Sequence, residues 1–284
     1  MAELARPVLP EFLYRYRSIP SPTVLERELA AITQQRLWFS RYEILNDPME
    51  GFYQPSKGAA KRNDFEEMAD LILRWKANIG ICCLSDTKDN ELMWTHYAGN
   101  YTGICVGYRT QLLLEGLSSE VRLVRLAYDG SPPEISRTDI RDPPATAIKI
   151  LSHKKSNWIY EREWRLLHSP TSPRPKTEEG WPLTIGARDC VSEVYLGSRI
   201  PEVVKLAIKK NLIGRPIRIF QMDVIDYEHT WETLQGSKFR SARTEPASAP
   251  ATNPRSTKPS RRRTTARTPA TRLTKAGAAR ARPS

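Results

Sequence analysis

The sequence predicts an α+β fold, with a mixed, mainly antiparallel sheet and flanking helices. Short runs rich in β-branched and aromatic residues occur along most of the chain, and amphipathic segments of helical period lie among them. These strands and helices do not alternate regularly, as they would in a doubly wound parallel sheet. No internal repeat is present. We therefore expect one irregular α+β domain over residues 1–237, followed by a tail of different composition at 238–284.

The first third of the chain carries clear strand and helix signals. Residues 12–19 (FLYRYRSI) alternate and are rich in β-formers, which predicts a strand. Residues 22–35 form an apolar stripe of helical period, and Thr23 with Glu26 predicts a capping box at the start of that helix. The elements that follow are a strand at 36–40, a turn at 45–51, a helix at 63–78 and a buried strand at 79–85.

The remainder of the body follows the same rules. Asp89 or Asn90 would cap a short helix that ends near Gly99 or Asn100. The later elements are a strand at 103–108, a loop at 129–144, a helical segment at 145–155, strands at 192–198 and 217–226, and a helix at 201–213.

Residues 157–167 (NWIYEREWRLL) mix charged and aromatic residues in an unusual way. We expect a helix ending near Trp158 and a strand from about Glu161. On a strand, Glu161, Glu163 and Arg165 would share one face, with Tyr160 and Trp164 on the other. That charged face is either an exposed ladder or the floor of a cleft. A helix pairing Glu161 with Arg165 is the remaining alternative.

The positive charge of the chain lies entirely in its tail. Thirteen of the 44 basic residues and one of the 32 acidic residues follow residue 237, so residues 1–237 are formally neutral. The tail is rich in Pro, Ala, Ser and Thr and has almost no large apolar groups, which predicts disorder. We expect residues 240–284 to contact nucleic acid or another polyanion, or else to serve only as a solubilising appendage.

Several classes of protein are disfavoured by composition and motifs. No apolar run is long enough to span a membrane, and the first residues do not resemble a signal peptide. The four cysteines lack C-x-x-C spacing, which favours reduced core thiols and a cytoplasmic protein. The chain has no phosphate-binding loop, dinucleotide fingerprint, H-E-x-x-H or G-x-S-x-G motif. Its four histidines show no metal-ligand spacing, so no metal site is expected.

Three segments combine aromatic with polar residues, at 37–51, 93–103 and 157–167, and we call them the polar–aromatic segments. The first holds Asn46, Asp47 and Glu50, and its Asp-Pro pair predicts a turn in which Asp47 accepts backbone hydrogen bonds. The second places His96 and Tyr97 at a helix end. Each segment alone is compatible with a purely structural role. Together they indicate a site, provided that they converge in one pocket.

The order of these motifs resembles the bacterial domain of unknown function family 2971. The residues that carry the resemblance are LYRYRSI, LWFSRYEILNDPMEG, DNELMWTHYAGNYTGICVGY, WIYEREWRL and VYLGSRI, spread over about residues 13–225. This resemblance implies a shared domain and a set of characteristic residues but no reaction, cofactor or protein partner. The basic tail is not part of the family pattern.

A second resemblance, in architecture, is to NAD-dependent ADP-ribosyltransferases. It implies NAD as substrate, with Arg15 or Arg17 holding the ribose and Tyr97 or Tyr101 stacking on nicotinamide. Glu163, with Glu161 beside it and Glu193 as a rival, would stabilise the ribosyl cation, as in glycosidic cleavage. Trp94 and His96 are further candidate binding residues. The chain departs from that pattern because it lacks the Ser-Thr-Ser strand.

Two other functions remain open at this point. A non-enzymatic module would use the polar–aromatic segments as a recognition groove for a ligand or nucleic acid, with affinity supplied by the tail. A metal-dependent nuclease would use Asp47, Glu50, Glu161 and Glu163, although the P-D…E-x-K signature is missing.

Overall fold

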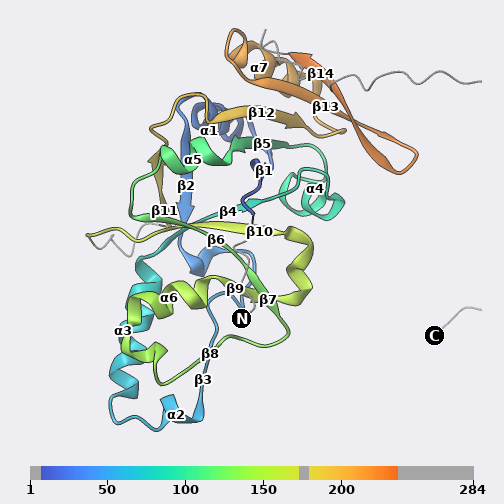
Figure 1. Cartoon of the computed structure of the whole chain (residues 1–284). Coiled ribbons are helices and arrows are strands. Elements are labelled where there is room, and N and C mark those ends of the chain that lie inside the picture. Colours follow the sequence, from blue (N-terminus) through green and yellow to red (C-terminus); the bar gives the residue numbers. More distant parts are fainter. Residues whose placement is uncertain (1–7, 173–178, 236–284) are drawn as a thin grey trace, which may run out of the picture. The chain divides into compact units, whose positions relative to one another are not determined.

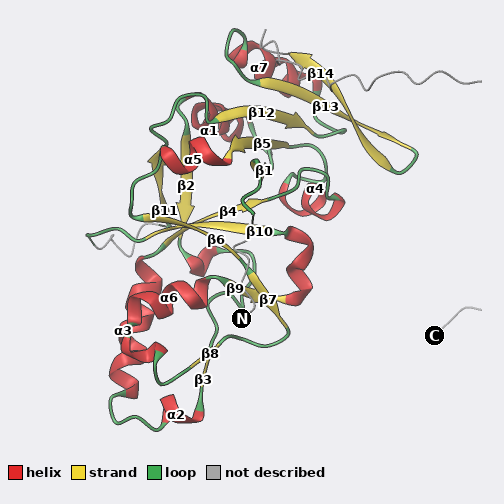
Figure 2. Cartoon of the chain, in the orientation of Figure 1, coloured by secondary structure: helices red, strands yellow, loops and turns green. Residues whose placement is uncertain are grey.

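The computed structural model describes residues 8–172 and 179–235 (Figure 1). The predicted tail at 238–284, and the boundary before it, lie outside these residues and stay predictions. The described part is a mixed sheet with flanking helices (Figure 2), so the predicted α+β class with a mainly antiparallel sheet is confirmed.

The main sheet has ten strands, and most of its neighbours are antiparallel. Its order is β11-β2-β4-β1-β5-β12-β13-β14, with β10 on β4 and β6 on β10. Only the pair β12–β13 in this sheet is parallel. Two small parallel pairs, β3–β8 and β7–β9, lie apart from it.

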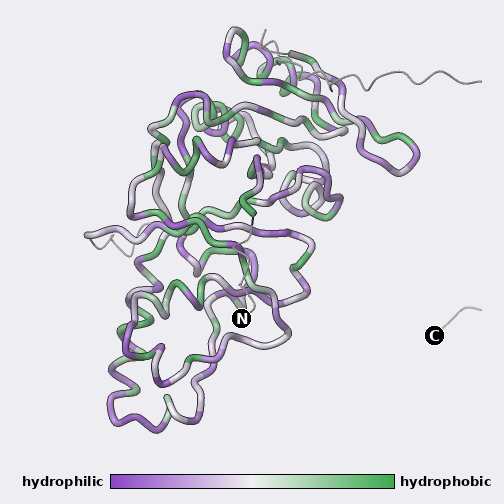
Figure 3. Tube along the Cα trace, in the orientation of Figure 1, coloured by the Kyte–Doolittle hydropathy of each residue, from purple (hydrophilic) through white to green (hydrophobic). Residues whose placement is uncertain are grey.

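The strands are β1 (Phe12–Arg17), β2 (Arg36–Ser40), β3 (Gln54–Pro55), β4 (Gly80–Ser85), β5 (Ile104–Arg109), β6 (Val121–Arg125), β7 (Ala127–Asp129), β8 (Glu134–Ile135), β9 (His153–Lys155), β10 (Glu163–His168), β11 (Gly180–Thr184), β12 (Val191–Leu196), β13 (Arg218–Ile225) and β14 (Glu228–Gln235). Figure 3 shows hydrophobic and hydrophilic residues interspersed along the chain. Strand β13 buries residues on both of its faces, with Ile219 in one hydrophobic core and Met222 in another.

The α-helices are α1 (Pro22–Thr33), α2 (Lys57–Ala60), α3 (Phe65–Asn78), α4 (Glu91–Tyr97), α5 (Thr110–Glu115), α6 (Pro143–Leu151) and α7 (Glu202–Leu212). Short 3-10 turns are η1 (Tyr42–Ile44), η2 (Asp139–Arg141) and η3 (Ser156–Glu161). The predicted cap at Thr23 is wrong, because α1 begins at Pro22 and the side chain of Ser21 accepts the hydrogen bond from Val24 N–H. Proline suits this first position because its missing N–H has no helical partner there.

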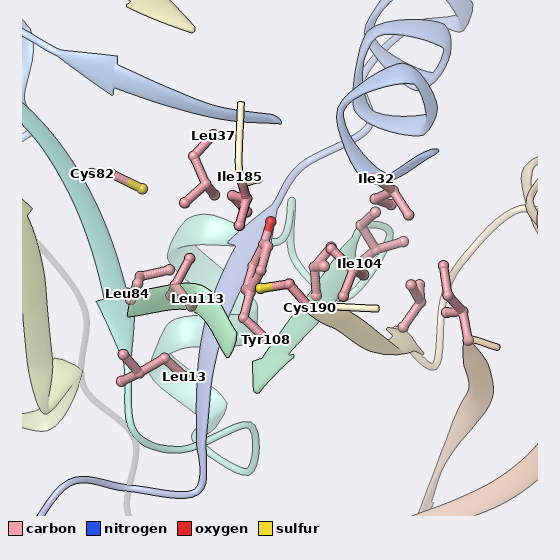
Figure 4. Packing of buried hydrophobic residues seen from close by; sticks show 14 of the residues in the cluster. Leu13, Ile32, Leu37, Cys82, Leu84, Ile104, Tyr108, Leu113, Ile185 and Cys190 are labelled. Atoms are coloured by element: carbon pink, nitrogen blue, oxygen red, sulfur yellow. The ribbon is translucent and has the colours of Figure 1, made fainter. Parts of the chain in front are cut away.

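Alternating residues of the central strands build the two larger hydrophobic cores, on opposite faces of the sheet. The larger core packs Leu13, Ile104 and Val194 against α1, α5 and α7, and Figure 4 shows its centre around Tyr108 and Leu113. The second core is aromatic, and it packs the intervening strand residues, among them Tyr16, Cys105 and Tyr195, against α4. Burial on both faces explains why these strands read as nearly continuous apolar runs.

Two further features of the described residues concern the cysteines and the length of the helices. Cys82, Cys83, Cys105 and Cys190 are all free thiols, and Cys83 is the least buried. Among the described residues, no helix combines the length and apolarity needed to cross a bilayer.

Candidate functional site

The sheet forks at β4, and the fork opens a pocket. One edge of β4 pairs with β1 through Ser85 and Tyr14, and then with β2 through Ile81 and Ser40. Cys83, between these two contacts, has neither strand as a partner. The other edge of β4 pairs with β10 along its whole length. A pocket of about 220 Å³ lies where β1 and β2 diverge.

All three polar–aromatic segments contribute to this pocket. Its lining includes Ser40, Ile44, Leu45, Asn46 and Glu50 from the first segment, Met93 and Tyr97 from the second, and Glu161, Glu163 and Arg165 from the third. Strand β1 adds residues 14–17, among them Arg15 and Arg17. Five of the nine residues that the resemblance to ADP-ribosyltransferases proposed therefore line one cavity, namely Arg15, Arg17, Tyr97, Glu161 and Glu163.

A tight turn delivers Glu50 to the pocket. The Asp47 carboxylate accepts a hydrogen bond of 2.9 Å from the Met49 N–H, which confirms the expected role of Asp47. Gly51 follows with a φ of +74°, a conformation that side chains with a Cβ disfavour. Its carbonyl accepts a hydrogen bond of 2.6 Å from the buried Lys76. The turn therefore holds Glu50 in a fixed position.

A break in the backbone aims Glu161 and Glu163 into the same space. Glu161 is the last residue of η3, not a strand residue as predicted, and β10 starts only at Glu163. Arg162 between them has a left-handed φ of 47°, and it pairs with Asp86 at 2.5 Å. The Ser85 hydroxyl donates to the Glu161 carbonyl at 2.7 Å. The left-handed residue is what turns the chain from η3 into β10.

Five buried charges form one continuous cluster. Arg165 Nε lies 2.7 Å from Glu163 Oε1, and its Nη2 lies 2.5 Å from Glu50 Oε1. Lys154 Nζ lies 2.6 Å from Glu161 and 3.1 Å from Glu163. Arg165 is fully buried and the three glutamates are at most 7% exposed. The exposed charge ladder considered for this segment is therefore wrong, and so is the helical pairing of Glu161 with Arg165.

The two central glutamates have opposite ionisation behaviour. Burial alone would raise the pKa of Glu163, but Arg165 and Lys154 outweigh it and lower that pKa to about 2. Burial raises the pKa of Glu161 to about 7. The positive charge of Lys154 opposes this rise only in part, and the negative charge of Glu163 increases it. With three carboxylates and two cations, the cluster carries one surplus negative charge, and Glu161 is the group that titrates.

Tyr97 completes the site next to Glu161. Its hydroxyl donates a hydrogen bond of 2.5 Å to Glu161 Oε1. Burial, and then the neighbouring Glu161 charge, raises the pKa of Tyr97 far above the usual value, so the hydroxyl stays protonated as a donor. Asn46 lines the pocket beside Tyr97 and opposes this rise in the pKa of Tyr97.

The two arginines of β1 lie on the other side of the pocket. Arg17 pairs with Glu28 of α1 at 2.6 Å, and the Arg15 guanidinium donates to the Trp38 carbonyl at 3.2 Å. The Nε atom of Arg17 is buried, and within the described residues it has no hydrogen-bond partner. An unpaired buried donor on a pocket wall is suited to a ligand oxygen.

Four other candidates from the sequence lie outside the pocket. Trp94 is fully buried, donates to the Lys88 carbonyl at 2.8 Å and packs edge-on against Tyr16. Tyr101 stacks on Trp94 with ring centroids 6.2 Å apart. His96 lies on the exposed face of α4. Glu193 bonds to Tyr195 and Arg218 instead.

One member of the charge cluster, Lys154, was not singled out from the sequence. Lys154 lay inside a stretch predicted to be helical, yet it sits on the short strand β9. Arg165 was expected beside Glu163 on one strand face, and Glu50 was named both in the first polar–aromatic segment and as a metal ligand. Their role becomes visible only when β9, β10 and the 45–51 turn meet in space.

The carboxylates proposed for metal binding are already engaged by cations of the chain. Lys154 or Arg165 contacts each of the glutamates Glu50, Glu161 and Glu163. The Asp47 carboxylate accepts a hydrogen bond from a backbone N–H within its own turn. Within residues 8–172 and 179–235, no three His, Cys, Asp or Glu side chains are placed to hold a metal ion. The arrangement therefore does not favour the nuclease alternative.

Comparison with known proteins supports part of the resemblance. Residues 93–166, about a quarter of the chain, match the family described as Protein of unknown function (DUF2971). No curated protein and no solved structure gave a match. The matched stretch runs from α4 to β10 and holds Tyr97, Lys154, Glu161, Glu163 and Arg165, so it supplies most of the polar wall of the pocket.

Proposed function

We propose that the chain is an NAD-utilising enzyme, similar to ADP-ribosyltransferases, that breaks the nicotinamide–ribose bond in the fork pocket. The observation that carries the proposal is convergence: Arg15, Arg17, Tyr97 and Glu161 come from distant parts of the chain and line one cavity. Perturbed carboxylates in a concave site beside unpaired donors are typical of an active site.

The charges on the two walls of the pocket complement those of NAD. The buried glutamate cluster has one surplus negative charge, which suits the cationic nicotinamide ring and the ribosyl cation that forms from it. The diphosphate is anionic and would lie against Arg15 and Arg17, where the free Nε of Arg17 is available. A volume of about 220 Å³ fits the nicotinamide riboside half better than the whole dinucleotide.

The fork also presents backbone groups that fit a carboxamide. Thr110 N–H bonds to the Glu11 carbonyl, so odd-numbered residues of β1 face β5, and Tyr16 faces the fork. Asp86 N–H bonds to the Arg162 carbonyl, so Cys83 likewise faces away from β10. One N–H and one C=O from each of Tyr16 and Cys83 therefore point to the gap. The nicotinamide carboxamide has one acceptor and two donors to match them.

The chemical step follows from this placement. The bond between ribose C1′ and the nicotinamide nitrogen breaks, and its electron pair stays on the departing nicotinamide, which leaves neutral. Positive charge moves to the ribose, next to the ionised glutamates. A hydroxyl of the acceptor, or water, then forms a new bond to C1′ and gives its proton to Glu161. A pKa of about 7 suits a general base at neutral pH.

The geometry favours Glu161 over Glu163 as the reacting carboxylate. Both oxygens of Glu163 are occupied, by Arg165 and Lys154, and its pKa of about 2 makes it a poor base. Glu161 is held by one lysine and one tyrosine and titrates near neutrality. Glu163 then serves to position Lys154 and to keep the local charge negative.

We further propose that the basic tail binds a second partner. Residues 240–284 carry nearly all of the chain's excess positive charge, and such segments bind phosphate backbones through release of counterions. We assign to them affinity for nucleic acid or another polyanion. A chain that binds polyanions but leaves NAD intact would be the non-enzymatic binding module.

Nicotinamide release from NAD by the purified full chain tests the proposal. Glu161→Gln keeps the shape of the side chain but removes its charge, so it should lower the turnover number at least about a hundredfold. Glu193→Gln is the matched control, since Glu193 is equally buried and hydrogen-bonded but lies away from the pocket. Equal turnover in the parent and in Glu161→Gln would refute the assignment.

A further inference from the structure

A strained residue links two of the glutamates that line the pocket. Arg162 has a φ of 47° and a ψ of 48°, the left-handed conformation that residues with a Cβ disfavour. Of the described non-glycine residues with a positive φ, it is the one whose two chain neighbours, Glu161 and Glu163, both line the pocket. Such residues persist only where the surrounding structure enforces them, and they gather at active sites. The strain at Arg162 therefore lies at the site itself.

Hydrogen bonds on both sides of Arg162 enforce its conformation. On one side, the Glu161 carbonyl accepts a hydrogen bond of 2.7 Å from the Ser85 hydroxyl. On the other side, the Glu163 N–H donates a hydrogen bond of 2.8 Å to the Tyr128 hydroxyl. The backbone is therefore anchored immediately before and after the left-handed residue, and both glutamates are held in fixed positions.

The side chain of Arg162 does not take part in the pocket. It is 57% exposed, it pairs with Asp86 at 2.5 Å, and it is not among the residues that line the cavity. An ion pair with one exposed partner contributes little, because water screens it. The contribution of this position to the site therefore comes from its backbone.

We propose that Arg162 is a positioning residue whose left-handed backbone, and not its charge, places the Glu161 carboxylate in the charge cluster. A right-handed residue at this position would continue η3, and an extended residue would lengthen β10. Either change would move Glu161 relative to its two hydrogen-bond partners, Tyr97 on α4 and Lys154 on β9. The inference concerns how the site holds a proton, and it does not rest on NAD as the substrate.

The titration of Glu161 reports its position, because the groups around it and its burial hold its pKa at about 7. A Glu161 side chain that leaves this environment returns toward the ordinary pKa of 4.5. The titratable and charged groups of this environment come from every element packed around Glu161, namely Lys154 of β9, Glu163 and Arg165 of β10, Glu50 of the 45–51 turn, Tyr97 of α4, Tyr128 of β7 and Tyr160 of η3.

Two substitutions that both remove the guanidinium separate the backbone from the charge. Glycine adopts the left-handed conformation freely, whereas valine is nearly excluded from it. The Glu161 carboxyl is followed by carbon-13 NMR in protein labelled at the glutamate carboxyl carbons, and Glu161→Gln identifies its signal. Arg162→Gly should keep the titration at about pH 7, and Arg162→Val should lower it by at least about one pH unit.

Nicotinamide release from NAD is measured on the same two proteins. Arg162→Gly should turn over NAD at least about tenfold faster than Arg162→Val, because small displacements of a reacting group are costly. Gln35→Val is the matched control, since Gln35 also has a left-handed φ of 50° but does not line the pocket. It should leave the titration of Glu161 unchanged.

The proposal is overturned if Glu161 titrates at the same pH in Arg162→Gly and Arg162→Val. A lowering of the titration in Arg162→Gly would also overturn it, because the guanidinium would then be what matters. The glycine variant decides alone if Arg162→Val does not fold. A parent chain that releases no nicotinamide would refute the proposed enzymatic function, and the titration of Glu161 would still test this inference.

Discussion

Arg165→Met removes the central cation of the buried cluster and leaves its carboxylates without their main partner. Arg165 donates five hydrogen bonds, two to Glu163, two to Glu50 and one to the Leu151 carbonyl, and it is fully buried. A sum of the free energies of these bonds would overstate their contribution to stability, because removing the charges from water costs free energy when the protein folds. Breaking a buried ion pair from one side typically destabilises a protein by 3–5 kcal/mol, so we expect a loss of about 4 kcal/mol.

A double-mutant cycle separates charge imbalance from lost packing. Arg165→Met raises the surplus of the cluster from one negative charge to two, and adding Glu50→Gln restores it to one. Glu50→Gln alone should cost about 1.5 kcal/mol, since it weakens two hydrogen bonds to a charged group. The double variant should therefore be about 2 kcal/mol more stable than the sum of the two single changes.

Urea unfolding followed by circular dichroism gives the free energies of unfolding for this cycle. Arg218→Met is the control, because Arg218 also pairs with a buried glutamate but is 45% exposed, and it should cost less than about 1 kcal/mol. A loss below about 1 kcal/mol for Arg165→Met, or strict additivity in the cycle, would show that Arg165 is not the cation that stabilises the buried carboxylates.

The remaining predictions concern pH, the 45–51 turn and the tail. Folding lowers the pKa of Glu163 from 4.5 to about 2, so ionised Glu163 adds about 3 kcal/mol to the free energy of unfolding. This stabilisation is present above pH 4.5 and is lost as the pH drops toward 2. Because the pKa of Glu161 rises to about 7, stability should instead fall by about 3 kcal/mol between pH 4.5 and 7, and Glu161→Gln should abolish this fall in urea unfolding. Asp47→Ala should cost about 1 kcal/mol, as does loss of a local cap; a variant with unchanged unfolding but no activity would contradict a purely structural role. Deleting residues 240–284 should leave the melting temperature unchanged and remove most of the salt-dependent DNA binding; an equal salt slope in the shortened chain would place the polyanion site elsewhere.

Much of the fold could be predicted because local signals and burial agree. The runs at 79–85 and 103–108 are apolar on both faces and became the central strands β4 and β5. Strands β6 and β11 were missed, because their residues are only partly apolar and their partners β10 and β2 are distant in sequence. The start of β10 was misplaced by two residues, because nothing in the sequence marks Arg162 as left-handed.

The site was predictable only in part, for a similar reason. Composition identified the three polar–aromatic segments, and the structure brings them into one pocket. Period-two alternation correctly put Glu163 and Arg165 on one face, but it could not show that Lys154 on β9 lies between the two glutamates. Ranking Glu161 above Glu163 depends on those contacts, since they set which carboxylate titrates.

A structure of Glu161→Gln soaked with NAD tests the proposed site directly, because this variant should bind the dinucleotide without cleaving it. We expect nicotinamide in the fork, with its carboxamide on the backbone of Tyr16 and Cys83, the ribose beside residue 161 and the diphosphate at Arg15 and Arg17. An empty fork at saturating NAD, or a dinucleotide bound elsewhere on the chain, would contradict it.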